Sequence, residues 1–238
     1  MDLHALLFLP LGLLALNLYA LLLVVLRAPL FRTRLYRPMV LNIGLSIAPA
    51  LVMLVTLVLL IVVVQVVPSS AGVWTVLVLG GLAWLLVLPN AAYLLTELNL
   101  THRRQAETVP LWYDIVLVLA LAMSGVLNTL ANVGIAQLAW VAMTNDTVAQ
   151  ARDDAGGWVL AGAVLLLVAL GIYLGRYIRF NSWDLLHPAS FARKLTGHFR
   201  RPENLRAAGG FVLTHGIFLA ILYLVIAVPA ITLILGTA

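Results

Sequence analysis

The sequence predicts an all-α fold, a polytopic transmembrane bundle of about six spanning helices plus a short cytoplasmic amphipathic helix. Three observations support this prediction. Of the 238 residues, 63% are hydrophobic and only 10% are charged, whereas soluble domains carry about 25% charged residues. The mean hydropathy is +1.09. The apolar residues also gather in six runs that are each as long as the ~20 residues needed to cross a bilayer as a helix.

The six runs follow one another along the whole chain. We expect the first to span the membrane rather than to be a cleaved signal peptide, because it is too long and has neither a basic start nor a small-residue cleavage site. Pro49 and Pro89 lie inside runs, which neighbouring helices can accommodate. The predicted spans are approximately residues 4–26, 39–67, 74–96, 111–143, 158–180 and 208–235. We predict a single transmembrane domain over residues 1–238.

The basic residues predict the orientation of the spans. In the six-span topology, 13 of the 14 Lys and Arg residues lie in the loops 27–38, 97–110 and 176–207, all on one side. Short loops rich in Lys and Arg stay in the cytoplasm. We therefore expect a multi-pass protein of a bacterial cytoplasmic membrane with both termini outside.

An interfacial segment, residues 181–207, follows the fifth predicted span on the cytoplasmic side. Within it, Phe191, Leu195 and Phe199 share one helical face. Arg193, Lys194, His198 and Arg200 fall elsewhere on that helix. A short basic amphipathic helix of this kind suits the surface of an anionic leaflet. Anionic membrane lipids are the expected partners.

Polar residues within the spans gather towards the predicted cytoplasmic ends. We predict a shared pocket there, because a buried arginine near the bilayer seeks a carboxylate. Arg176 and Arg179 share a helix face and offer bidentate donors to a phosphate or carboxylate. The pocket residues predicted from position alone are Asn90, Glu97, Asp114, Arg176, Arg179, Asp184 and His215.

The polar and aromatic residues at and within the spans also have structural interpretations. Trp112, Tyr113 and Trp183 fit an aromatic belt at the headgroup level, and His215 fits a hydrogen-bonded interhelical residue. In the fourth span, Ser124, Asn128 and Asn132 form a stripe near mid-membrane. We interpret this stripe as interhelical hydrogen bonding, with Gly125 permitting a close approach of two helices.

Four motifs together resemble a family of bacterial multi-pass membrane proteins defined by a domain of unknown function. They are LNIGLSIAP (41–49), PNAAYLLTEL (89–98), PLWYD (110–114) and GRYIRFNSWD (175–184). The family pattern is closer to PNAPYLLTDL followed by a histidine, so Ala92, Glu97 and the displaced His102 are departures. The site residues that the resemblance implies are Asn90, Glu97, Trp112, Tyr113, Asp114, Arg176, Arg179, Asn181, Trp183 and Asp184.

Three functions remain open at this stage. The first is a binding or transport protein whose pocket holds an anionic ligand or lipid headgroup. The second is a membrane-embedded enzyme acting on a lipid or lipid-linked substrate, with Asp114, Glu97 and His215 as catalytic candidates. The third is a structural or accessory subunit. An oligomer is compatible with all three.

Composition excludes some chemistry. With no cysteine in the chain, disulfides, thiol nucleophiles and thiolate metal sites are ruled out. The net charge of +5 resides in short loops between apolar runs, so it predicts membrane orientation and not nucleic-acid binding. No motif identifies a metal or a cofactor.

Overall fold

The computed structural model describes residues 3–66, 68–98, 109–145, 154–178 and 188–237, and these are helical apart from short connections. Within these described residues, six helices are long and apolar enough to cross a membrane. They confirm the predicted all-α polytopic architecture. The six spans are Leu7–Phe31, Arg37–Val66, Ser70–Leu95, Leu111–Thr144, Ala155–Ile178 and Pro202–Thr232.

The chain divides into two compact units, Met1–Thr129 and Leu130–Ala238. We name them unit 1 and unit 2. Helix α5 (Leu111–Thr144) contributes its first part to unit 1 and its last part to unit 2. The single transmembrane domain stays a prediction.

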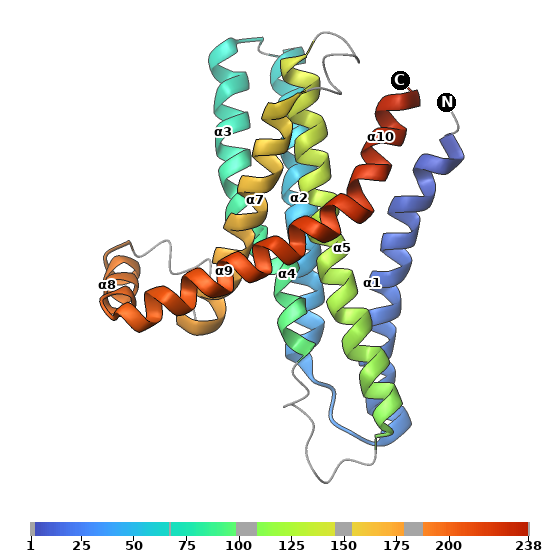
Figure 1. The fold of residues 1–238 in the computed structure, drawn as a ribbon. Coiled ribbons are helices and arrows are strands. Elements are labelled where there is room, and N and C mark those ends of the chain that lie inside the picture. The colour runs from blue at the N-terminus through green and yellow to red at the C-terminus, as the bar shows by residue number, and fades with distance from the viewer. Residues whose placement is uncertain (1–2, 67, 99–108, 146–153, 179–187, 238) are drawn as a thin grey trace. The chain divides into compact units, whose positions relative to one another are not determined.

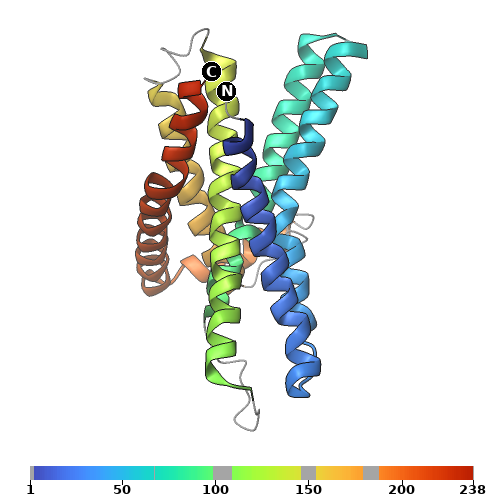
Figure 2. The ribbon, with the colours of Figure 1, turned by 90° about the vertical axis from the view of Figure 1, so that its right-hand side faces the viewer.

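Unit 1 begins with α1 (Leu3–Phe31) and the helical hairpin of α2 (Arg37–Val66) and α3 (Ser70–Val87). The short connection at Ser69, whose side chain accepts from Gly72 N, caps α3 and brings it back along α2. Figure 2 shows these two helices side by side. Most of the residues of α2 and α3 are not buried, as expected for helices that face lipid.

The third span stops being one regular α-helix at Pro89. Proline has no N–H to continue the ladder, and α3 gives way there to the short helix α4 (Pro89–Ala92) and the 3₁₀ segment η1 (Tyr93–Leu98). Both α4 and η1 pack on α2. The core of unit 1 joins α1, α2, η1 and α5 through Leu23, Ile43, Leu94 and Leu117, among others.

Unit 2 holds α7 (Ala155–Tyr173), which ends in a π-helical segment, η3 (Leu174–Ile178). Next come α8 (Pro188–Phe199), α9 (Pro202–Leu222), a second π segment, η5 (Tyr223–Ala227), and α10 (Val228–Thr237). Figure 1 shows α9 and α10 as one bent rod, with α8 beside the start of α9. The bend coincides with η5 and with Pro229, as expected where a proline interrupts the α-helical ladder.

The main packing in unit 2 joins α7 and α9. Gly216 permits it, since an added Cβ at that position would lie 2.7 Å from Leu166 Cδ2. Helices α7 and α9 are apolar along most of their lengths. This close packing therefore holds them together, and not a division of each helix into an apolar and a polar face.

Two predicted boundaries were wrong. Helix α1 continues to Phe31, so Arg27 is a helical residue and not part of a loop. The sixth helix begins at Pro202 and not at 208, because proline suits the first turn of a helix. The predicted amphipathic helix is confirmed as α8.

Candidate functional site

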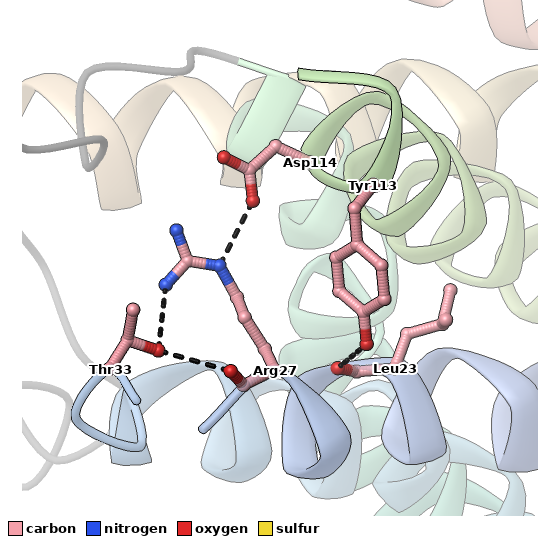
Figure 3. A network of polar contacts seen from close by, with 5 residues as sticks. All are labelled: Leu23, Arg27, Thr33, Tyr113 and Asp114. Atoms are coloured by element: carbon pink, nitrogen blue, oxygen red, sulfur yellow. Dashed lines mark hydrogen bonds and ion pairs between the residues drawn. The ribbon is translucent and has the colours of Figure 1, made fainter. Parts of the chain in front are cut away.

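The most distinctive polar group in unit 1 is an ion pair between α1 and α5 (Figure 3). Arg27 Nε donates to Asp114 Oδ1 at 2.9 Å. The Asp114 side chain is only 6% exposed and that of Arg27 17%. Asp114 lies in the first turn of α5, where the helix dipole favours a negative charge. The pair therefore joins the start of one span to the end of another.

The end of α1 is built so that it orients Arg27. Arg32 adopts a left-handed backbone conformation with φ of 52°, and Thr33 N donates to Ala28 O at 3.1 Å. This is the bond of a Schellman cap. It turns the chain so that Thr33 Oγ1 donates to Arg27 O at 3.2 Å and lies 3.4 Å from Arg27 Nη1.

Tyr113 fixes the same two helices beside the ion pair. Its hydroxyl donates to Leu23 O at 2.8 Å, and its ring meets the Phe31 ring edge-on, with centroids 4.9 Å apart. Tyr113 is 5% exposed. Trp112, the neighbouring residue, is 64% exposed and meets Tyr113 edge-on. Consecutive residues of PLWYD thus point to different surroundings.

The second carboxylate oxygen of Asp114 is the unusual atom of the network. Among the described residues, Oδ2 is buried and has no hydrogen-bond partner. In Figure 3 it is directed away from α1, opposite the oxygen that Arg27 holds. A buried acceptor left unbonded costs about 1–3 kcal/mol, and more when it is charged.

The structure describes only part of the predicted pocket. Trp112, Tyr113 and Asp114 lie together in unit 1, and Asn90 lies half-buried in α4 of the same unit. Arg176 is exposed in η3 of unit 2. The side chain of Glu97 falls outside the described residues, as do His102, Arg179, Asn181, Trp183 and Asp184.

His215 differs from its predicted interhelical role. Its Nδ1 lies 3.0 Å from Phe211 O, one turn back on its own helix α9. Its ring stacks on the Phe211 ring with centroids 3.7 Å apart. Within the described residues, no three His, Asp or Glu side chains come together as a metal site would require.

Sequence reasoning missed Arg27 and Thr33 as site residues, because Arg27 was counted as a loop charge. One signal was present. Asn17, Ala20, Val24 and Arg27 recur at helical spacing on one stripe of α1, which indicates a buried face. A polar group at each end of such a stripe predicts partners on neighbouring helices.

Of the predicted polar stripe of α5, Asn128 makes the expected interhelical hydrogen bonds in unit 1, whereas Ser124 donates to Leu121 O of its own helix at 2.9 Å. Asn128 and Asn17 exchange two hydrogen bonds of 3.0 Å. Asn128 Nδ2 also donates to Ser46 Oγ at 2.7 Å. Gly125 allows the approach, since an added Cβ would lie 2.6 Å from Ala91 O. Three helices are thereby tied together inside the apolar core.

Unit 2 has its own polar cluster, at the start of α9. Tyr173 Oη lies 2.9 Å from His198 Nε2 and 3.3 Å from Asn204 O. Asn204 Nδ2 donates to His198 O at 2.9 Å. These bonds fasten α8 to α7 and α9. His198 is therefore on the inner side of α8 and half-buried like Phe191, Leu195 and Phe199, so the prediction that it lies away from their face was wrong.

Exposed cations lie on η3, on α8 and at the start of α9, the elements next to this fastening. On α8, Phe191, Leu195 and Phe199 are half-buried while Arg193 and Lys194 are exposed. We use the name basic surface for the exposed cations of unit 2: Arg176, Arg193, Lys194, Arg200, Arg201 and Arg206. Glu203 is the one acidic residue between positions 188 and 206.

Comparison with known proteins gives a family and no activity. No curated protein and no solved structure matches the chain. A family model described as "Protein of unknown function (DUF1361)" matches residues 41–222. The match contains all four motifs of the predicted resemblance and the polar cluster of unit 2, and it contains Tyr113 and Asp114 but not Arg27 or Thr33 of unit 1. The chain therefore belongs to the DUF1361 family.

Proposed function

We propose that this integral membrane protein binds the anionic group of a lipid headgroup through the basic surface of unit 2. The observation that carries the proposal is the fastening of α8 at His198. Hydrogen bonds hold the helix by its inner side, so that Arg193 and Lys194 are presented outward. Phosphates of anionic lipids attract such juxtamembrane cations by about 1 kcal/mol each.

Arg176 links this proposal to the predicted pocket. It lies in η3, and η3 packs on α8. The predicted ligands Arg179, Asn181, Trp183 and Asp184 belong to the stretch of sequence that connects η3 to α8. We propose that these four residues contact the same headgroup.

The proposal also places the basic surface on the cytoplasmic side of a bacterial plasma membrane. Its support is the distribution of Lys and Arg along the sequence. Leu35 precedes α2 and Ser70 opens α3, so these two exposed residues lie at opposite ends of one spanning helix. Because the chain has no cysteine, Leu35→Cys and Ser70→Cys are single reporters.

A thiol reagent that cannot cross membranes tests the orientation. Applied to intact cells, it should label Ser70→Cys and spare Leu35→Cys, and inverted vesicles should give the opposite result. The reverse pattern would place the basic surface outside and refute this part of the proposal.

Lipid competition tests the binding itself. The purified protein is incubated with equal amounts of phosphatidylglycerol and phosphatidylcholine, and the retained lipids are counted by mass spectrometry. We expect retention of phosphatidylglycerol, weakened by salt. The triple variant Arg193→Gln, Lys194→Gln, Arg200→Gln should lose the part of this preference that salt weakens.

The matched control removes exposed cations from the connection before α2 and from the first residue of α2, in unit 1. Arg34→Gln with Arg37→Gln should leave the preference for phosphatidylglycerol nearly unchanged. Equal retention of both lipids by the natural chain would refute headgroup binding, and would favour a structural or accessory role for the motifs. Added inorganic phosphate distinguishes a free anion from a headgroup, because only a site for free phosphate would be emptied by it.

A further inference from the structure

We infer that unit 1 contains a second headgroup site, in which Asp114 Oδ2 accepts a hydrogen bond from an N–H or O–H donor of a lipid. This site is independent of the basic surface, which lies in unit 2. It also differs in chemistry, because it selects a donor where the basic surface selects a negative charge.

Asp114 is hydrogen-bonded through only one of its two carboxylate oxygens among the described residues. Oδ1 accepts from Arg27 Nε at 2.9 Å. Oδ2 is buried and has no partner among the described residues. A carboxylate that pairs with a guanidinium in this way acts as an acceptor only. The missing partner must therefore be a donor.

The rest of the network keeps Asp114 from turning to meet another protein group. Arg27 is held on its far side by Thr33, and Tyr113 binds the backbone of α1 at Leu23. These contacts preorganise both residues before any ligand arrives. An acceptor fixed in this way favours a donor at one position. It discriminates against a group that has no N–H or O–H hydrogen to donate.

The location indicates that the donor belongs to a lipid. Arg27 lies one turn from the end of the Leu7–Phe31 span, and Asp114 lies in the first turn of the Leu111–Thr144 span. The ends of spans lie at the headgroup level. The part-exposed side chain of Arg27 connects the network to the surface, and the exposed Trp112 ring stands beside it.

Two common headgroup chemistries offer such donors. Ethanolamine carries an ammonium with N–H groups, and glycerol carries hydroxyls. Choline has the same net charge and phosphate as ethanolamine but no N–H. The donor, rather than the charge, is therefore what separates ethanolamine from choline at this site.

A methylation series on the natural protein tests the inference without any substitution. Phosphatidylethanolamine, its N-methyl and N,N-dimethyl forms and phosphatidylcholine each compete with a fixed amount of labelled phosphatidylethanolamine, and the retained label is counted. We expect similar competition by the three lipids that keep an N–H, and about tenfold weaker competition by phosphatidylcholine. A gradual decline across the series would indicate size selection and overturn the inference.

Variants locate the acceptor. Asp114→Asn should lose the preference for ethanolamine over choline, while Glu203→Gln, which removes an acidic charge in unit 2, should keep it. Should Asp114→Asn fail to fold, the methylation series on the natural chain still decides the question.

The two proposals fail separately. Ethanolamine and choline lipids are both zwitterionic, so neutralising Arg193, Lys194 and Arg200 should leave their ratio unchanged. Phosphatidylglycerol supplies hydroxyl donors, and its retention by that triple variant should persist at the level of phosphatidylethanolamine. Equal retention of ethanolamine and choline lipids would mean that Asp114 serves the ion pair alone.

Discussion

Asn128 and Ser46 are 82 residues apart in sequence, yet Asn128 Nδ2 donates to Ser46 Oγ at 2.7 Å. The same amide exchanges hydrogen bonds with Asn17. One side chain of α5 thus binds α1 and α2 together. Within an apolar core these polar bonds determine which faces of the helices meet, because apolar faces alone are interchangeable.

Removing the amide tests this tie. We expect Asn128→Ala to lower the free energy of unfolding by about 1 kcal/mol, the usual size of an interhelical bond in membranes. Asn17→Ala in the same background should add little, because its main partner is already gone. Unfolding in mixed micelles measures both. Fully additive losses would contradict a shared network.

Gly125 should tolerate no side chain. An added Cβ would lie 2.6 Å from Ala91 O and 2.7 Å from Leu94 Cβ, so the helices must separate. We expect Gly125→Ala to destabilise unit 1 by about 1–3 kcal/mol. Gly44→Ala is the matched control, since nothing lies within 4 Å of its added Cβ, and it should gain up to about 1 kcal/mol in helix propensity.

Breaking the ion pair of Arg27 and Asp114 should destabilise the protein more than replacing both residues with apolar ones. Arg27→Met strands a buried carboxylate and should cost about 3 kcal/mol. The double variant Arg27→Met, Asp114→Leu removes both charges and should recover much of that loss. The thermal unfolding midpoint in detergent measures the difference. A double variant less stable than Arg27→Met would show that the Asp114 carboxylate stabilises the fold even without Arg27.

Arg32 holds a strained conformation at the cap of α1. A left-handed backbone costs a residue with a side chain about 1–2 kcal/mol, and glycine avoids this cost. Arg32→Gly should therefore raise the unfolding midpoint, whereas Arg32→Ala should not. If both substitutions act alike, loss of the basic charge and not relief of the backbone explains the result.

The hydroxyl of Tyr173 should control the fastening of α8. Tyr173→Phe removes the bonds to His198 and Asn204 while keeping the aromatic packing. Each lost bond is worth about 1 kcal/mol, so amide hydrogens of Phe191–Phe199 should exchange several-fold faster. Tyr177→Phe, which alters the stacked neighbour of Tyr173, is the control. Unchanged exchange in Tyr173→Phe would mean that apolar packing alone holds α8.

Hydropathy along the chain was sufficient to predict the helical class, the number of spans and the amphipathic helix α8. These are local properties, because about 20 consecutive apolar residues must bury their own backbone bonds wherever they lie. The errors fell at the ends. The sequence predicts a loop at Arg27 and a start of α9 six residues late, because a polar residue in a last or first turn looks the same as one in a connection.

The partners of the polar residues were decided only by the tertiary structure. The sequence identified Asp114, Tyr113 and Asn128 as residues needing an explanation, but it did not indicate that Arg27, Leu23 and Asn17 on α1 would meet them. A carboxylate can pair with any arginine at the same membrane depth. Which arginine it takes depends on which helix packs beside it, and contacts such as that of Gly125 with α4 determine that packing.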